Sequence, residues 1–92
     1  MIQSFGSEET EKLFLRERVK RFEKFERVAL RKLEMLHSAV SITDLKIPPG
    51  NMLEPLQGKR SGHHSIRIND QWRICFIWKD GNGYDVQIED YH

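Results

Sequence analysis

The sequence lacks several features that would point to common classes of protein. It has a single cysteine, Cys75, among 92 residues, which excludes an internal disulfide and a zinc site built from cysteines. No apolar run approaches the roughly 20 residues that a membrane-spanning helix needs. The opening residues MIQSFGSEE lack the basic and apolar regions of a secretory signal. We therefore expect one soluble domain in the reducing cytoplasm, without a metal or other cofactor.

Net charge is also nearly absent, at +1, but the charges are unevenly distributed. Residues 8–34 alternate in sign, which is typical of a solvated helix face. The stretch from Pro55 to Lys79 is basic by contrast, because Asp70 is its only acidic residue and its cationic residues are Lys59, Arg60, Arg67, Arg73 and Lys79. A locally basic stretch of this kind is compatible with a phosphate-bearing partner.

Helices are predicted in the first half of the chain. Ser7, followed by the acidic run EETE, has the features of a helix N-cap. A second helix is predicted by an apolar stripe with spacings of three and four residues, made of Phe22, Phe25, Ala29, Leu33, Leu36 and Val40. Pro48 and Pro49 prevent its continuation. The junction between the two helices has no breaker, so one bent helix remains an alternative.

Strands are predicted after Gly50, where the apolar period changes from about four to two. We expect strands at residues 64–68, 72–78 and 84–88, a weaker one around 52–56, and a short one at residues 2–5. Helices followed by an antiparallel meander predict an α+β fold for one domain over residues 1–92. Two N-terminal helices would pack on one face of a small, mainly antiparallel sheet.

The alternation within strands predicts which side chains share a face. In the central strand the larger apolar set should meet the helices, namely Trp72, Ile74, Phe76 and Trp78. Arg73 and Cys75 then face away from the core. A three-residue loop, Asn69 to Gln71, keeps the faces of the first hairpin consistent by pairing Ile68 with Trp72, and it leaves Ser65 and Arg67 outside.

The last strand completes this arrangement. Its core set would be Tyr84, Val86 and Ile88, and its outward set Asp85, Gln87, Glu89 and Tyr91. The open face of the sheet should thus collect Arg67, Arg73 and Tyr91 in one groove, with Asp90 and His92 at the rim. Because apolar anchors reach Ile88, we expect the terminal triplet to be ordered.

Such a face suits a phosphodiester. Guanidinium groups match phosphate oxygens with a planar fork of donors, and tyrosine can stack on a base or take part in proton transfer. Metal-free cleavage of RNA needs a base for the 2′-hydroxyl and an acid for the departing 5′-oxygen. It also needs positive charge where the phosphorane becomes negative.

The stretch GNMLEPLQGKRSGHHSIRINDQWRICFIWKDGNGYDVQIEDYH resembles the HigB group of the RelE/ParE toxin superfamily. The segment SIRINDQWRICF and the closing DYH are its specific parts, and MIQSF resembles the family's first strand. The resemblance covers essentially the whole chain and implies a RelE-like fold. It also implies a ribosome-dependent endoribonuclease that cuts mRNA on the 70S ribosome and is neutralised by a helix-turn-helix, HigA-like antitoxin from the same operon.

The resemblance also assigns roles to residues. Arg73 would stabilise the phosphate, Tyr91 would stack on or orient a base, and Asp90 with His92 would supply acid–base chemistry. Residues that would hold mRNA or ribosomal RNA are Gln57, Lys59, Arg60 and Arg67.

This chain departs from the family in one motif. Better-known members carry His-Pro-Leu-Lys-Gly where this chain has EPLQG, from Glu54 to Gly58. Glu54 is the expected replacement for the histidine as base for the 2′-hydroxyl, whereas only Lys59 stands near the missing lysine. We hypothesise a working, if slow, nuclease.

Other interpretations remain open. The fold also suits a ParE-like inhibitor of gyrase, or a protein that binds RNA without cutting it. The DYH ending beside outward arginines favours the nuclease, because a pure binder needs no imidazole and phenol there. Structural roles are the alternative for single residues: Arg73 as an ordinary salt-bridged residue, Glu54 as a loop carboxylate, and Cys75 as a small filler.

Overall fold

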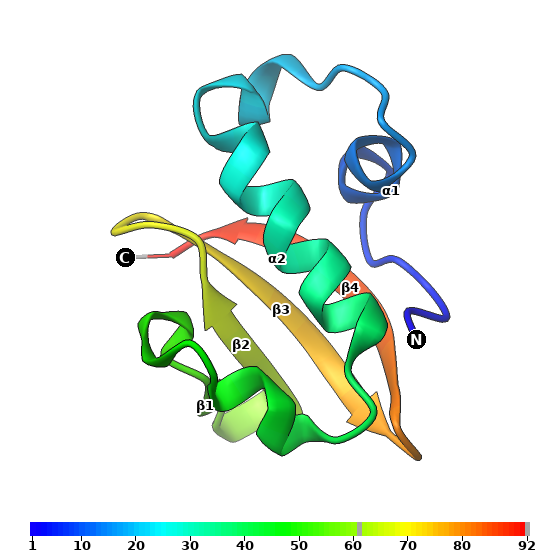
Figure 1. Ribbon diagram of the computed structural model, residues 1–92, viewed down its shortest axis with the longest axis vertical. Helices are drawn as coiled ribbons and strands as arrows, with labels where there is room; N and C mark the ends of the chain where they lie inside the picture. Colours follow the sequence, from blue (N-terminus) through cyan, green and yellow to red (C-terminus); the bar gives the residue numbers. More distant parts are fainter. Residues whose placement is uncertain (61, 92) are drawn as a thin grey trace.

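A four-stranded antiparallel sheet forms one layer of the molecule, and α2 crosses one of its faces with α1 beside it (Figure 1). This computed structural model describes residues 1–60 and 62–91. The strands lie in the order β1-β2-β3-β4. The elements, with 3-10 helices written η, are α1 (Glu8–Phe14), η1 (Lys20–Phe25), α2 (Glu26–Ser38), η2 (Ile42–Lys46), η3 (Pro49–Asn51), β1 (Glu54–Pro55), η4 (Gly58–Arg60), β2 (His63–Arg67), β3 (Trp72–Lys79) and β4 (Asn82–Asp90). The predicted α+β fold is confirmed.

The two N-terminal helices are separate. The Ser7 side chain caps α1 by accepting a hydrogen bond from the Thr10 backbone N–H at 3.2 Å. α1 ends at Phe14, and Arg16 follows with φ of 70°, a left-handed conformation that does not continue a helix. The alternative of one bent helix is therefore wrong.

The apolar stripe of α2 forms the centre of the core, with Ala29, Leu33 and Leu36 fully buried. Val40 was predicted to continue the stripe but is 80% exposed. The reason is that α2 ends at Ser38 and the backbone is already extended at Ala39, with ψ of 138°. The helical period no longer applies beyond that residue.

The N-terminal segment runs beside β4 in two isolated parallel bridges, Ile2 with Gly83 and Phe5 with Val86. The backbone N–H of Gln3 donates to the carbonyl of Gly83 at 2.8 Å. The predicted strand at residues 2–5 therefore pairs with the sheet only at these bridges. The weaker strand expected around residues 52–56 is the short β1.

The hairpin between β2 and β3 has the predicted three-residue loop. Arg67 stands opposite Arg73 in the ladder, and the Ile68 N–H donates to the Trp72 carbonyl at 2.9 Å. This register turns Ile66 and Ile74 into the core, where both are fully buried. The predicted division of faces along β2 and β3 is confirmed.

The pairing of β3 with β4 contains an irregularity that the sequence did not predict. The register shifts between Cys75 and Ile77, and Asp85 has φ of 51°. One inserted residue in a strand reverses the alternation on its far side. Tyr84 consequently pairs with Ile77, on the face away from the helices, so its predicted place in the core is wrong. Val86, beyond the irregularity, is fully buried as predicted.

Candidate functional site

Arg73 is the centre of the candidate site, on the face of β3 that points away from α2. Its Nε donates to Ser65 Oγ at 2.8 Å, and its Nη2 donates to the carbonyl oxygens of Met52 at 2.6 Å and Ser65 at 3.3 Å. Only 7% of Arg73 is exposed. The predicted face is correct, but the expectation that it is open is wrong at this position. The residues leading into β1 lie against the guanidinium and fix its orientation.

Tyr91 covers the same guanidinium. Its ring centroid lies 5.6 Å from Arg73 Cζ, a cation–π distance. The Tyr91 backbone N–H donates to the Gln71 carbonyl at 2.6 Å, which extends the β3–β4 pairing beyond the end of β4. Tyr91 is 38% exposed, so it is accessible from solvent.

Asp90 lies at the rim of the sheet. It stands opposite Trp72 in the ladder, one position along from the pair of Arg73 and Glu89, so alternation places it on the opposite face from Arg73. The Gln71 Nε2 donates to Asp90 Oδ2 at 3.1 Å. The hairpin loop therefore holds this carboxylate. His92 lies outside the described residues.

Glu54 brings a carboxylate to the guanidinium. It stands opposite Ser65 in the pairing of β1 with β2. Its Oε1 lies 3.9 Å from Arg73 Nη2, and its side chain is 45% exposed. This contact is long for an ion pair, so the carboxylate keeps acceptor capacity for another donor. A guanidinium, a phenol ring and a carboxylate thus gather at one place.

A second ion pair closes the neighbouring part of this face. Arg60 donates to Glu89 from Nη1 at 2.8 Å and from Nη2 at 2.6 Å, in the bidentate geometry of strong charge-assisted bonds. This hydrogen bonding lowers the pKa of Glu89. The pair covers Cys75, which is 1% exposed, and burial with the nearby Glu89 raises the pKa of its thiol to about 12. The thiol is therefore protonated and inert at neutral pH.

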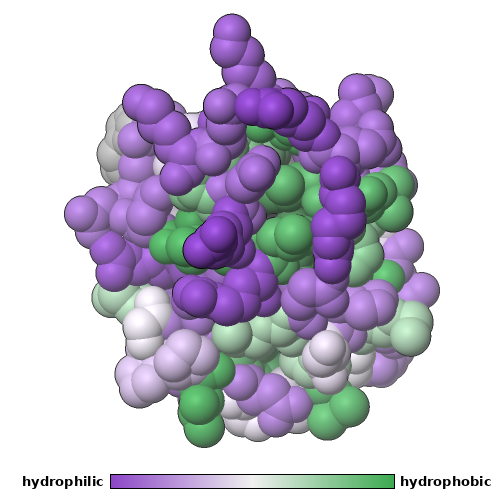
Figure 2. All heavy atoms as spheres, turned by 45° about the horizontal axis from the view of Figure 1, so that its top comes forward, coloured by the Kyte–Doolittle hydropathy of each residue, from purple (hydrophilic) through white to green (hydrophobic). Residues whose placement is uncertain are grey.

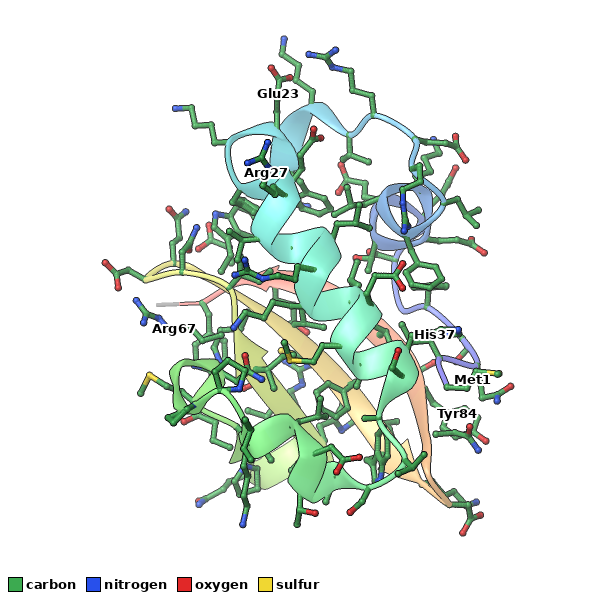
Figure 3. The ribbon with its side chains drawn as sticks, in the orientation of Figure 1. Met1, Glu23, Arg27, His37, Arg67 and Tyr84 are labelled. Carbon is green, nitrogen blue, oxygen red and sulfur yellow. The ribbon has the colours of Figure 1, made fainter. Side chains whose placement is uncertain are left out.

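The remaining predicted RNA-binding residues lie around this centre. Lys59, in η4, and Gln57, just before it, are both exposed. Arg67 stands opposite Arg73 in the ladder, but its guanidinium turns to Asp70 in the hairpin loop. Figure 3 shows Arg67 pointing outward at that end of the sheet. The predicted convergence therefore holds for Arg73 and Tyr91 and fails for Arg67.

A groove lies at a different place, between the end of α1 and the start of α2. It encloses about 440 Å³ and is lined by Leu13, Arg16, Glu17, Arg18, Glu26, Arg27 and Leu30. Figure 2 looks toward this end of the molecule, where hydrophilic side chains surround smaller apolar patches. Within residues 1–60 and 62–91, no cluster of histidine, cysteine, aspartate and glutamate is arranged to hold a metal ion. None of the described helices combines the length and apolar character required to cross a membrane.

The chain matches the family model of HigB-like toxins, described as the RelE-like toxin HigB of type II toxin–antitoxin systems, over residues 4–92. The chain belongs to this family. Toxin HigB-1 of Vibrio cholerae is 44% identical over 64 residues, which cover 70% of this chain and 67% of the relative. Endoribonuclease HigB of Proteus vulgaris is 45% identical over 40 residues, or 44% of each chain.

Solved structures confirm the fold of this HigB-like toxin. A mutant of YafQ from E. coli superposes with a TM-score of 0.66, over 98% of this chain and 91% of its own. The YoeB–YefM toxin–antitoxin complex of Staphylococcus aureus contains a chain with a TM-score of 0.62, over 100% of this chain and 98% of its own. Both are 17% identical to it, so they show the RelE-like fold alone.

Sequence reasoning missed two groups in the site of this HigB-like toxin. Ser65 lies on the outer face as predicted, but it is fully buried there and accepts a hydrogen bond from Arg73. Its position on the same face, two residues along β2 from the partner of Arg73 in the ladder, was a usable signal. The Met52 carbonyl had no such signal, because its direction follows from a left-handed backbone conformation, with φ of 46°.

Proposed function

We propose that this HigB-like toxin is an endoribonuclease that cuts mRNA on the translating ribosome, through metal-independent attack of a 2′-hydroxyl on the adjacent phosphate. The observation that carries the proposal is the arrangement around Arg73. Its guanidinium is fixed by hydrogen bonds, faces the Tyr91 ring at 5.6 Å and lies 3.9 Å from the Glu54 carboxylate. The name of the relative from Proteus vulgaris, an endoribonuclease, supports the same activity.

In the proposed reaction, Glu54 accepts the proton of the 2′-hydroxyl. The 2′-oxygen then bonds to phosphorus, the bond from phosphorus to the 5′-oxygen breaks, and the leaving oxygen takes up a proton. The products are a 2′,3′-cyclic phosphate and a 5′-hydroxyl. Each positioned acid or base contributes about 10²–10⁴-fold to the rate of such a reaction.

Arg73 stabilises the pentavalent phosphorane. Its donors to Ser65 and the Met52 carbonyl hold the guanidinium before substrate arrives. A preorganised charge in a site shielded from water needs no reorganisation during the reaction and therefore stabilises the transition state strongly. Tyr91 stacks on a base next to the scissile phosphate. Asp90, which Gln71 holds at the rim of the sheet, and His92 complete the acid–base set, as the resemblance of the closing DYH to this family implies.

The cations around the site hold the RNA backbone. Arg67 is ion-paired to Asp70, which is 98% exposed, and an exposed pair contributes only about 0–1 kcal/mol. A phosphate can therefore replace Asp70 at small cost. Lys59 and Gln57 are exposed and extend the same surface. Arg60 contacts RNA only from its solvent side, because its fork of donors is occupied by Glu89.

The proposed partners are the 70S ribosome carrying mRNA and a HigA-like helix-turn-helix antitoxin from the same operon. Membership in a family of type II toxin–antitoxin toxins supports the antitoxin.

Primer extension on cellular mRNA after induction tests the proposal. The native protein should produce new 5′ ends within translated messages, and Arg73→Ala and Tyr91→Ala should not. Purified protein should cut mRNA on translating ribosomes. Intact messages combined with a DNA-damage response would identify a gyrase inhibitor, and intact messages combined with salt-sensitive RNA binding would identify a non-catalytic binder. Either result refutes the nuclease.

A further inference from the structure

Lys32 is a buried cation on α2 that the proposed reaction does not use. It is 6% exposed. Its Nζ donates to Asn51 Oδ1, and in the part of the chain that the structure describes no carboxylate lies within ion-pair distance of it. Burial lowers the pKa of Lys32, and the charges of Arg31 and Arg67 lower it further. An apolar residue would fill this position without the cost of removing a charge from water.

Asn51, the partner of Lys32, is held on every side. It is fully buried. Its Nδ2 donates to the Leu45 carbonyl at 3.1 Å and lies 3.1 Å from Met35 Sδ, while its backbone N–H donates to the Pro48 carbonyl at 2.9 Å. Lys32 satisfies the remaining side-chain oxygen. This side chain therefore connects α2 to the end of η3.

The residue after Asn51 contacts the candidate site. Met52 has a left-handed backbone with φ of 46°, and its N–H donates to the Pro49 carbonyl at 3.0 Å. Its carbonyl accepts the 2.6 Å hydrogen bond from Arg73 Nη2. A continuous path of hydrogen bonds and one peptide step thus leads from Lys32, through Asn51 and Met52, to Arg73.

We propose that Lys32 and Asn51 are positioning residues that set the orientation of the Arg73 guanidinium from the opposite face of the sheet. This inference rests on the proposed function in one respect, namely that Arg73 contacts the scissile phosphate. It explains why a costly buried cation occupies a place where packing alone favours an apolar side chain. Natural proteins accept local instability of this kind where it serves a functional site.

The geometric part is tested on the free protein, without RNA. The Arg73 Nε–H donates to a fully buried hydroxyl, so it should give a slowly exchanging resonance in a ¹⁵N NMR spectrum, assigned by its loss in Arg73→Lys. In Lys32→Met this resonance should shift and exchange with water about tenfold faster or more, because opening of the site becomes easier. An unchanged resonance in a folded Lys32→Met protein overturns the proposal.

Arg31→Met is the matched control. Arg31 is the exposed neighbour of Lys32 on α2. Its substitution by methionine removes one positive charge, as Lys32→Met does, but leaves the contact between Lys32 and Asn51 in place. The Arg73 resonance should stay as in the wild type. If Lys32→Met does not fold, Lys32→Gln removes the charge at nearly the same size and should produce the same change. Equal effects of Arg31→Met and the Lys32 variants would show a general charge effect and refute positioning.

The functional part is tested by a double-mutant cycle. Lys32→Met should lower kcat about tenfold with KM within a factor of about two, since only transition-state stabilisation is lost. In an Arg73→Lys background the same substitution should have almost no further effect, because the group it positions is gone. Lys32→Arg, which keeps a donor and the charge, should restore part of kcat. Independent, multiplicative losses in kcat would identify a purely structural role for Lys32.

A wild-type protein that cuts no RNA would refute the proposed function, whereas the NMR comparison would still decide whether Lys32 positions Arg73.

Discussion

Replacing Arg73 by alanine should affect both stability and catalysis, and the structure separates the two effects. The hydroxyl of Ser65 is fully buried and loses the donor that Arg73 Nε provides. Unsatisfied buried acceptors cost about 1–3 kcal/mol, whereas the exposed Met52 can turn its carbonyl to water. For a domain of this size the Tm should fall by roughly 5–20 °C. Loss of one preorganised donor to a transition-state charge lowers kcat by about 10²–10³-fold.

The assay measures Tm by circular dichroism and single-turnover cleavage of mRNA on ribosomes, well below the lower Tm. Arg73→Lys keeps a charge but loses the planar fork, so its activity should lie between those of the wild type and Arg73→Ala. Lys79→Ala, at the exposed end of the same strand, is the control for net charge and should cut normally. The reasoning is refuted if folded Arg73→Ala cuts within a factor of about two of the wild type.

Three further predictions concern the groups around Arg73. Glu54→Gln should slow single-turnover cleavage by about 10²–10⁴-fold while changing the free energy of unfolding by less than about 0.5 kcal/mol. Cleavage by Glu54→Gln at the wild-type rate would show that another group is the base. Arg60 lowers the folded-state pKa of Glu89, so the stability from this pair is present above the ordinary glutamate pKa and is lost as pH falls through the lowered value. When the free energy of unfolding is measured against pH, Glu89→Gln should lack this loss at acid pH. The same acid dependence in Glu89→Gln and the wild type would contradict the prediction. For binding of single-stranded RNA, Arg67→Gln should reduce the slope of the logarithm of the association constant against the logarithm of salt concentration by about 0.7. Asp70→Asn, which frees the Arg67 guanidinium, should tighten binding. An unchanged affinity in both variants would show that Arg67 does not contact RNA.

The sheet was predictable because local patterns specify it. The alternation from Trp72 to Trp78 has only one register in which the large apolar side chains are all covered. That condition also fixed the length of the loop after Ile68. The face of Arg73 therefore follows from the sequence alone, and so does the approach of Tyr91 to Arg73 along the neighbouring strand.

Positions that depend on backbone irregularities were not predictable. The left-handed conformation of Asp85 reverses the alternation before it and moves Tyr84 to the other face. Neither aspartate nor its neighbours carry a distinctive signal for this conformation. The burial of Arg73 was missed for a similar reason, because it depends on how the residues before β1 return across the sheet. Their direction is set by buried hydrogen bonds of Asn51, which a pattern of apolar residues does not encode.

Glu54 fits the proposed mechanism because its contact with Arg73 is loose and its side chain is 45% exposed. A phosphate that binds Arg73 must replace the Glu54 carboxylate beside the guanidinium, which leaves the carboxylate oxygens available to accept the proton of the 2′-hydroxyl. A bidentate pair such as that of Arg60 and Glu89 would resist this exchange, so the looser 3.9 Å contact of Glu54 with Arg73 is the geometry expected of a base that acts on bound RNA.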